Sequence, residues 1–123
     1  MYELTVKGEF AASHSLRGYE GKCKKLHGHT WHVDVVVRGE KVNGVGMLID
    51  FKEIKGDLKN ILEGLDHGHL NNLPYFKKAN PTSENIAKYI FDCLAKKIHG
   101  VKVQRVTVWE SEKSGASYEK SSR

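Results

Sequence analysis

Cysteine and proline are scarce in this chain of 123 residues, which has two of each. The two cysteines, Cys23 and Cys93, are far apart in the sequence, so no disulfide framework is predicted and each is expected to be a free thiol. Long hydrophobic runs are also missing. The longest, such as residues 35–37 and 47–49, are much shorter than the roughly 20 residues that a membrane-spanning helix needs. The first residues alternate in polarity, unlike a secretory signal, so a cytoplasmic protein without a membrane partner is expected.

The overall composition is ordinary, with 39% hydrophobic and 28% charged residues. These fractions exclude collagen-like, mucin-like and intrinsically disordered classes, and the length suits one domain over residues 1–123. The formal net charge is +5 at pH 7, which favours an anionic partner such as a phosphorylated metabolite or a nucleic acid. The charge alone does not choose between these two partners.

Alternating polarity predicts strands at both ends of the chain. Even positions are mostly apolar over residues 2–14, and odd positions are apolar over residues 29–38, so two half-buried strands are expected to pair as neighbours. A valine-rich segment at 101–110 and a short segment at 116–118 predict two further strands.

Two helices are predicted in the middle of the chain. Asp50 and Glu53 form a capping-box pattern before apolar residues spaced three and four apart, from Phe51 onward, and this helix should end near Gly64. Either Thr82 or Ser83 can cap a second helix that extends toward residue 100. Segregated strands and helices predict an α+β fold, in which two helices cover one face of a four-stranded antiparallel sheet.

Histidine is abundant, and four of the seven histidines fall between residues 14 and 32. His14 lies on the apolar face of the first predicted strand, while His27 and His29 continue the apolar face of the second, so the three imidazoles can point the same way. Three nitrogen ligands with one open tetrahedral position are typical of catalytic zinc. A His-X-His pair taken alone can equally be hydrogen-bonded within a sheet, but His14 and the nearby Cys23 favour a metal.

Cys23 precedes His27 by four positions and has two possible roles, a fourth zinc ligand or a thiolate that acts beside the metal. The flanking lysines at 22, 24 and 25 stabilise a thiolate, which favours a reactive residue over a structural one. Spacing alone does not decide between the two roles. Cys93 lies at the edge of the second predicted helix's apolar stripe and is expected to be a packing residue.

Six motifs together resemble the family of 6-pyruvoyl-tetrahydropterin and 6-carboxy-tetrahydropterin synthases, and they cover nearly the whole chain in order. They are Phe-Ala-Ala-Ser-His-Ser-Leu (10–16), Cys-Lys-Lys-Leu-His-Gly-His (23–29), Gly-Met-Leu-Ile-Asp-Phe (46–51), Leu-Asp-His-Gly-His-Leu-Asn (65–71), Asn-Pro-Thr-Ser-Glu-Asn (80–85) and Val-Trp-Glu (108–110). The short gap between Cys23 and His27 resembles the 6-carboxy-tetrahydropterin synthases of queuosine biosynthesis. The resemblance implies a tunnelling fold, in which small sheets of several subunits join into a barrel, and a homohexamer built as a dimer of trimers is expected.

The same resemblance assigns the site. It implies His14, His27 and His29 as zinc ligands and Cys23 as the general base. Asp66 and His67 are implied as a proton-handling pair, although this pair read alone is a solvated helix end.

Substrate contacts follow from the resemblance and from chemistry together. The carboxylate of Glu110 is expected to accept two hydrogen bonds from the amino group and ring N–H of a pterin. Thr82 and Ser83 match further pterin contacts of the family, although helix capping explains one of them equally well. Arg17 and the lysines at 22, 24 and 25 supply positive charge for a triphosphate. His32 and His69 have no assigned role and are expected to be structural or exposed.

The leading hypothesis is a zinc-dependent lyase that converts 7,8-dihydroneopterin triphosphate to 6-carboxy-5,6,7,8-tetrahydropterin, with loss of triphosphate and acetaldehyde. The first alternative is a 6-pyruvoyl-tetrahydropterin synthase, which retains the carbon side chain. A family member that acts on another pterin or purine is also compatible with the sequence. A basic zinc module that binds nucleic acid gives no role to Asp66, His67 or Glu110, so no nucleic-acid partner is expected.

Overall fold

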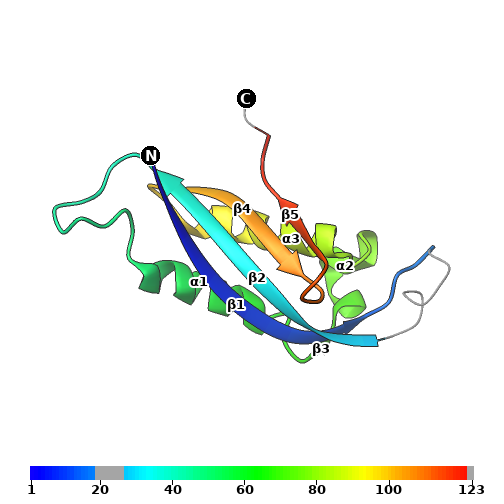
Figure 1. Cartoon of the computed structure of the whole chain (residues 1–123). Helices are drawn as coiled ribbons and strands as arrows, with labels where there is room; N and C mark the ends of the chain where they lie inside the picture. Colours follow the sequence, from blue (N-terminus) through cyan, green and yellow to red (C-terminus); the bar gives the residue numbers. More distant parts are fainter. Residues whose placement is uncertain (19–26, 122–123) are drawn as a thin grey trace.

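A five-stranded sheet forms one layer of the structure, and helices cover one of its faces (Figure 1). The structure is a computed structural model that describes residues 1–18 and 27–121. The strand order is β3-β1-β2-β4-β5, and β1 pairs in parallel with β3 while the other neighbours are antiparallel. The strands are β1 (Tyr2–His14), β2 (His27–Gly39), β3 (Gly68–His69), β4 (Lys102–Trp109) and β5 (Gly115–Tyr118).

The two long strands β1 and β2 pair along their whole length, as the alternating polarity predicts. The register runs from Tyr2 opposite Gly39 to His14 opposite His27. Phe10 lies opposite Trp31, and their rings stack with centroids 6.0 Å apart. Even positions of β1 and odd positions of β2 therefore share the face that packs into the core, which confirms the predicted parity.

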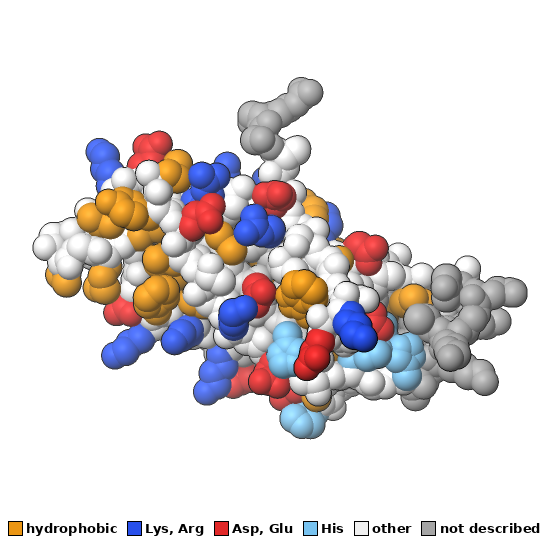
Figure 2. Space-filling view, in the orientation of Figure 1, with side chains coloured by type: hydrophobic (Ala, Val, Ile, Leu, Met, Phe, Trp, Pro, Cys, Tyr) orange, Lys and Arg blue, Asp and Glu red, His pale blue; other side chains and the backbone are white. Residues whose placement is uncertain are grey.

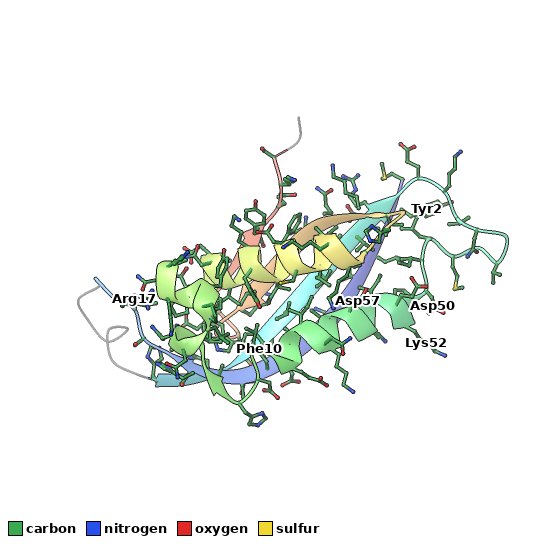
Figure 3. All side chains as sticks on the ribbon, turned by 180° about the vertical axis from the view of Figure 1, so that it is seen from behind. Tyr2, Phe10, Arg17, Asp50, Lys52 and Asp57 are labelled. Atoms are coloured by element: carbon green, nitrogen blue, oxygen red, sulfur yellow. The ribbon has the colours of Figure 1, made fainter. Side chains whose placement is uncertain are left out.

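Helices α1 (Phe51–Glu63) and α3 (Ser83–Lys97) lie across the covered face of the sheet (Figure 3). Asp50 caps α1 by accepting a hydrogen bond from the Lys52 N–H, and Gly64 follows its last turn. Of the two predicted caps of α3, the structure uses Thr82, whose hydroxyl accepts from the Asn85 N–H. The buried aliphatic side chains of α1 and α3 pack against the valines of the sheet.

Four details of the predicted fold are corrected. The sheet has a fifth strand, β3, whose two residues are a strand because they pair with Ala12 and Ser13 of β1. Between it and α3 lie the 3₁₀ turn η2 (Leu70–Asn72) and the short helix α2 (Pro74–Lys78), which the sequence pattern does not predict. Helix α3 ends at Lys97, whereas the sequence predicts that it extends toward residue 100. Phe51, predicted in the apolar stripe of α1, is 47% exposed because it begins the helix at the end of the sheet.

Among residues 1–18 and 27–121 the sheet does not close on itself, and it has two open edges. Strand β3 covers only Ala12 and Ser13 of β1, and the described residues give no strand partner to the remaining edge of β1. At the opposite edge lies the four-residue β5. In the described part of the chain, no helix has the length and apolar character needed to cross a membrane.

Candidate functional site

Three histidines meet at the end of the sheet where β2 begins. His14 is the last residue of β1, His27 is the first residue of β2 directly opposite, and His29 follows on the same face. The Nε2 atoms of His14 and His27 are 3.2 Å apart, and the three ring centroids lie 4.5–5.3 Å from one another. Histidine side chains also gather toward this end of the molecule in the space-filling view (Figure 2). The structure thus brings together the three residues predicted from strand parity.

Glu110 joins this cluster from β4. It follows the last residue of β4, and its Oε1 lies 2.8 Å from Nε2 of His29 and 3.8 Å from Nε2 of both His14 and His27. The ligand atoms of the four residues all lie within 4.8 Å of one another. From the sequence, Glu110 is predicted only as a substrate contact. Its shared parity with Val106 and Val108, together with β4 pairing beside β2, is the signal that places it here.

The donor set fits a metal ion. Four ligands at 2.0–2.1 Å from a tetrahedral ion lie about 3.3–3.4 Å apart, close to the distances found in the cluster. The Nδ1 of His14 lies 2.7 Å from the carbonyl oxygen of Pro81, which only accepts, so Nδ1 carries the proton and Nε2 presents a lone pair. Lone pairs and a carboxylate that converge on one point repel each other unless a proton, as in the hydrogen bond between His27 and His14, or a cation lies between them.

Burial disfavours the charged form of two of these imidazoles. It lowers the pKa of both His14 and His29 below the ordinary value for histidine, against the opposing influence of the Glu110 carboxylate. Nε2 of His29 is a buried atom without a hydrogen bond among the described residues, because its short approach to Glu110 lacks hydrogen-bond geometry. An unpaired buried nitrogen is costly, and a metal ion would satisfy it.

Trp31 forms the inner wall of the cluster. Its ring meets the rings of His14 and His29 edge to face, with centroids 4.9 and 5.2 Å apart. The indole N–H donates to the Ala12 carbonyl oxygen, so the ring cannot rotate without losing that bond. Because Trp31 is fully buried, it holds the imidazoles against a rigid surface.

The structure also pairs Asp66 with His67, but at the outer edge of β1. Asp66 accepts a hydrogen bond from the Ala11 N–H, and its second oxygen lies 2.8 Å from Nδ1 of His67. The Ala11 bond is the main reason that the pKa of Asp66 is lowered. His67 has a left-handed backbone with φ 56°, and its side chain is 83% exposed. Among the described residues, no contact joins this pair to the histidine cluster.

The remaining predicted residues differ in what the structure says of them. Cys23 and the three flanking lysines lie outside the described residues. Thr82 uses its hydroxyl to cap α3 beside Pro81, and Ser83 is the first residue of that helix. The Arg17 guanidinium donates to the Phe76 carbonyl oxygen at 2.7 Å.

Two of the histidines without a predicted role, His32 and His69, do not belong to the cluster. His32 is exposed on the opposite face of β2. His69 lies in β3, where its Nδ1 is 3.2 Å from the hydroxyl of Ser13.

Comparison with known proteins shows what this chain is similar to. The sequence model of the family described as 6-pyruvoyl tetrahydropterin synthase matches residues 3–121. The chain is 36% identical over 117 residues to the dihydroneopterin monophosphate aldolase of Pyrococcus furiosus, covering 94% of this chain and 96% of that protein. It is 28% identical, over 97% of this chain and 99% of the relative, to the 6-carboxy-5,6,7,8-tetrahydropterin synthase of Haemophilus influenzae.

A solved structure shows the same fold. The 6-pyruvoyl tetrahydropterin synthase of Caenorhabditis elegans superimposes with a TM-score of 0.89 at 28% identity, covering 98% of this chain and 96% of that chain. Both the family match and the superposition extend over almost the whole chain, and they include the strands that carry the histidine cluster. This protein belongs to the 6-pyruvoyl tetrahydropterin synthase family.

Proposed function

We propose that this protein is a zinc-dependent lyase that acts on 7,8-dihydroneopterin triphosphate in the cytoplasm. The reaction consumes water and yields 6-carboxy-5,6,7,8-tetrahydropterin, acetaldehyde and triphosphate, as in the queuosine-pathway members that the sequence resembles. The observation that carries the proposal is the cluster of three histidines beside Glu110 in a chain of this family. Several relatives with matches over most of the chain have the name 6-carboxy-5,6,7,8-tetrahydropterin synthase.

In this proposal His14, His27 and His29 hold the zinc ion. A zinc ion bound there supplies Lewis-acid polarisation of an oxygen on the substrate side chain, which makes the neighbouring C–H more acidic. The hydrogen bond to the Pro81 carbonyl fixes the tautomer of His14, and Trp31 fixes the orientation of two imidazoles. These contacts preorganise the ligand set.

Cys23 is proposed as the base that takes the proton from the substrate side chain, and Asp66 with His67 as the pair that returns or relays one. A proton on Nδ1 of His67 points at the Asp66 carboxylate, so Nε2 is left to exchange protons. The Ala11 N–H holds Asp66 in place from the other side. The pair therefore has a defined orientation although His67 is exposed.

Glu110 is proposed to accept two hydrogen bonds from the pterin, with Thr82 and Ser83 as further contacts. The Thr82 hydroxyl accepts the capping bond, and its own O–H remains a donor. Arg17 and the lysines at 22, 24 and 25 are proposed to attract the triphosphate, which agrees with the net charge of +5 and makes a nucleic-acid partner unnecessary.

We also propose that the chain is a single domain over residues 1–123 that assembles into a homohexamer, as a dimer of trimers. The support is the open edge of β1 at one side of the sheet and of β5 at the other. Pairing of unlike edges between neighbouring copies closes a ring and removes both edges. The Asp66–His67 pair lies at the β1 edge, where such a neighbour would approach.

Two alternatives have specific support. A 6-pyruvoyl product, with the side chain retained, is compatible with the family match. An aldol cleavage of dihydroneopterin monophosphate is compatible with the relative from Pyrococcus furiosus. All three reactions begin at the same substrate side chain, so the cluster alone favours none of them.

The test is to incubate the zinc-loaded protein separately with dihydroneopterin triphosphate and dihydroneopterin monophosphate and to identify the products by mass spectrometry. The proposal predicts 6-carboxy-tetrahydropterin and acetaldehyde from the triphosphate, at a rate well above that of any reaction of the monophosphate. A retained three-carbon side chain supports the pyruvoyl alternative. Cleavage of the monophosphate to a 6-hydroxymethyl pterin supports the aldolase.

A further inference from the structure

The Glu110 carboxylate has two competing partners, the histidine cluster and the proposed pterin, and it cannot offer both oxygens to the pterin while one of them lies in the cluster. Its Oε1 lies among three imidazole nitrogens, at 2.8, 3.8 and 3.8 Å. A pterin that donates two parallel N–H bonds needs both carboxylate oxygens on an open edge. Since the imidazoles surround Oε1, the side chain must move away from them before it can accept both bonds.

We propose that Glu110 is an exchangeable fourth metal ligand, which binds the metal in the absence of substrate and releases it to bind the pterin. This inference rests on the proposed function, because a pterin is the incoming ligand. Substrate binding and the opening of a coordination position then become one event. The position becomes open only when the pterin is in place to use it.

The surroundings of Glu110 differ from those of His14 and His29 and indicate why Glu110 moves while these two imidazoles stay in place. The side chain of His14 is 3% exposed and is fixed by the Pro81 carbonyl and by Trp31. His29 packs against the same indole ring. Glu110 instead sits beyond the end of β4, where its N–H is bonded to the Ser114 carbonyl in the turn to β5, and its side chain is 29% exposed. A longer side chain at a strand end has more rotamers available than imidazoles packed on a core tryptophan.

Turn geometry holds the backbone of Glu110 while leaving its side chain free. Gly115 lies opposite Trp109 in the β4–β5 pair, and a Cβ at that position would lie 2.6 Å from the Trp109 ring. The glycine therefore lets the turn close tightly beside Glu110. Swinging of the carboxylate requires side-chain rotation only, with no rearrangement of the sheet.

The first test loads the protein with Co²⁺, whose visible absorption depends on its ligands, and adds 6-methylpterin. This probe offers the pterin edge but has no side-chain hydroxyls that could bind the metal. We expect 6-methylpterin to change the visible spectrum of the Co²⁺ protein. We also expect 6-methylpterin to weaken Co²⁺ binding, by roughly 5- to 150-fold. Because coupling between two ligands is reciprocal, Co²⁺ should weaken 6-methylpterin binding by the same factor. An unchanged spectrum at saturating 6-methylpterin, or failure of the probe to bind, overturns the proposal.

The second test compares Glu110→Gln with Glu112→Gln, which removes an exposed carboxylate two residues away. A direct ligand should matter more than an outer-shell partner, so Glu110→Gln is expected to weaken Co²⁺ binding by at least about 100-fold, and Glu112→Gln to leave it unchanged. In Glu110→Gln, Co²⁺ and 6-methylpterin should no longer affect each other's binding. Far-ultraviolet circular dichroism checks that both variants are folded.

The outcomes separate this inference from the proposed function. Equal Co²⁺ affinity of Glu110→Gln and wild type overturns the exchange while leaving the lyase assay untouched. A wild-type protein that shows the Co²⁺ and 6-methylpterin coupling but forms no product from dihydroneopterin triphosphate retains the exchange and overturns the proposed reaction.

Discussion

His14 and His27 face each other across the end of the β1–β2 pair, with their Nε2 atoms 3.2 Å apart. Because Nδ1 of His14 is bonded to the Pro81 carbonyl, its Nε2 has no proton to donate when the ring is neutral. His29 and Glu110 bring two more electron-rich atoms to the same point. These four residues could hold a metal ion, which would interact favourably with all of these atoms at once.

Replacement of His29 by alanine should remove the metal. The wild-type protein is expected to bind about one zinc ion per chain, and His29→Ala close to none, because two imidazoles and a carboxylate hold zinc much less tightly than three imidazoles and a carboxylate. Metal analysis after dialysis measures the content. The matched control is His32→Ala, on the opposite face of the same strand. Equal zinc content in both variants would show that the ligand assignment is wrong.

Cys23→Ala separates the two roles left open for this cysteine. If Cys23 is the base, the variant keeps its zinc and loses most of its turnover, typically by about 10²- to 10⁴-fold for loss of a general base. Zinc content and kcat are measured on the same preparation. Cys93→Ala, which removes the other cysteine, is the control and should retain turnover. Loss of zinc together with activity would assign Cys23 as a ligand.

Much of the site follows from alternation of polarity along two strands. The parity of His14, His27 and His29 can be read without a structure, and the observed register brings them to one face. The place of Glu110 cannot be read locally, because it depends on β4 pairing with β2 across a long sequence separation.

The elements that the sequence does not reveal are short or tertiary in origin. Gly68 and His69 form a strand only through their contact with β1, and α2 has five residues, too few for a periodic pattern. Asp50 is identifiable as a cap, and the other cap is narrowed to Thr82 or Ser83, because the capping interaction is local. Phe51 fits the apolar stripe of α1 but is exposed, since burial depends on where the sheet ends.

The pH dependence of stability should reveal Asp66. The pKa of Asp66 is lowered mainly by the hydrogen bond from the Ala11 N–H. A carboxyl group with a lowered pKa stabilises the folded state at pH values above its pKa in the unfolded chain, about 3.9. This stabilisation is lost as the pH falls through the pKa of the folded state. The difference in unfolding free energy between wild type and Asp66→Asn should therefore be full at neutral pH and shrink below about pH 4. Denaturant unfolding of the metal-free proteins at several pH values measures it.

Asp66→Ala is the companion variant for this measurement. Neither Asn nor Ala titrates, so these two variants should differ in stability by an amount independent of pH. If the difference between wild type and Asp66→Asn were equally independent of pH, the hydrogen bond from Ala11 would not stabilise the carboxylate.

A proline in the open edge of β1 should prevent assembly while sparing the subunit. The Ala11 N–H and carbonyl point outward to Asp66 and His67, so by the two-residue period the N–H of Thr5 also points outward. Thr5→Pro removes a donor that a neighbouring strand would need, and an edge strand tolerates it. Sedimentation should show a closed oligomer for wild type and smaller species for Thr5→Pro, with similar circular dichroism. A wild-type monomer at all concentrations would contradict the proposed assembly.

Titration of zinc into the metal-free protein, with the rate of 6-carboxy-tetrahydropterin formation from dihydroneopterin triphosphate as the readout, tests the metal-dependent reaction most directly. The rate should be near zero without metal, rise in proportion to bound zinc and saturate at about one zinc ion per chain, the content of one tetrahedral site. Full activity of the metal-free protein, or no product when zinc is saturating, would contradict a reaction that depends on the cluster of His14, His27 and His29.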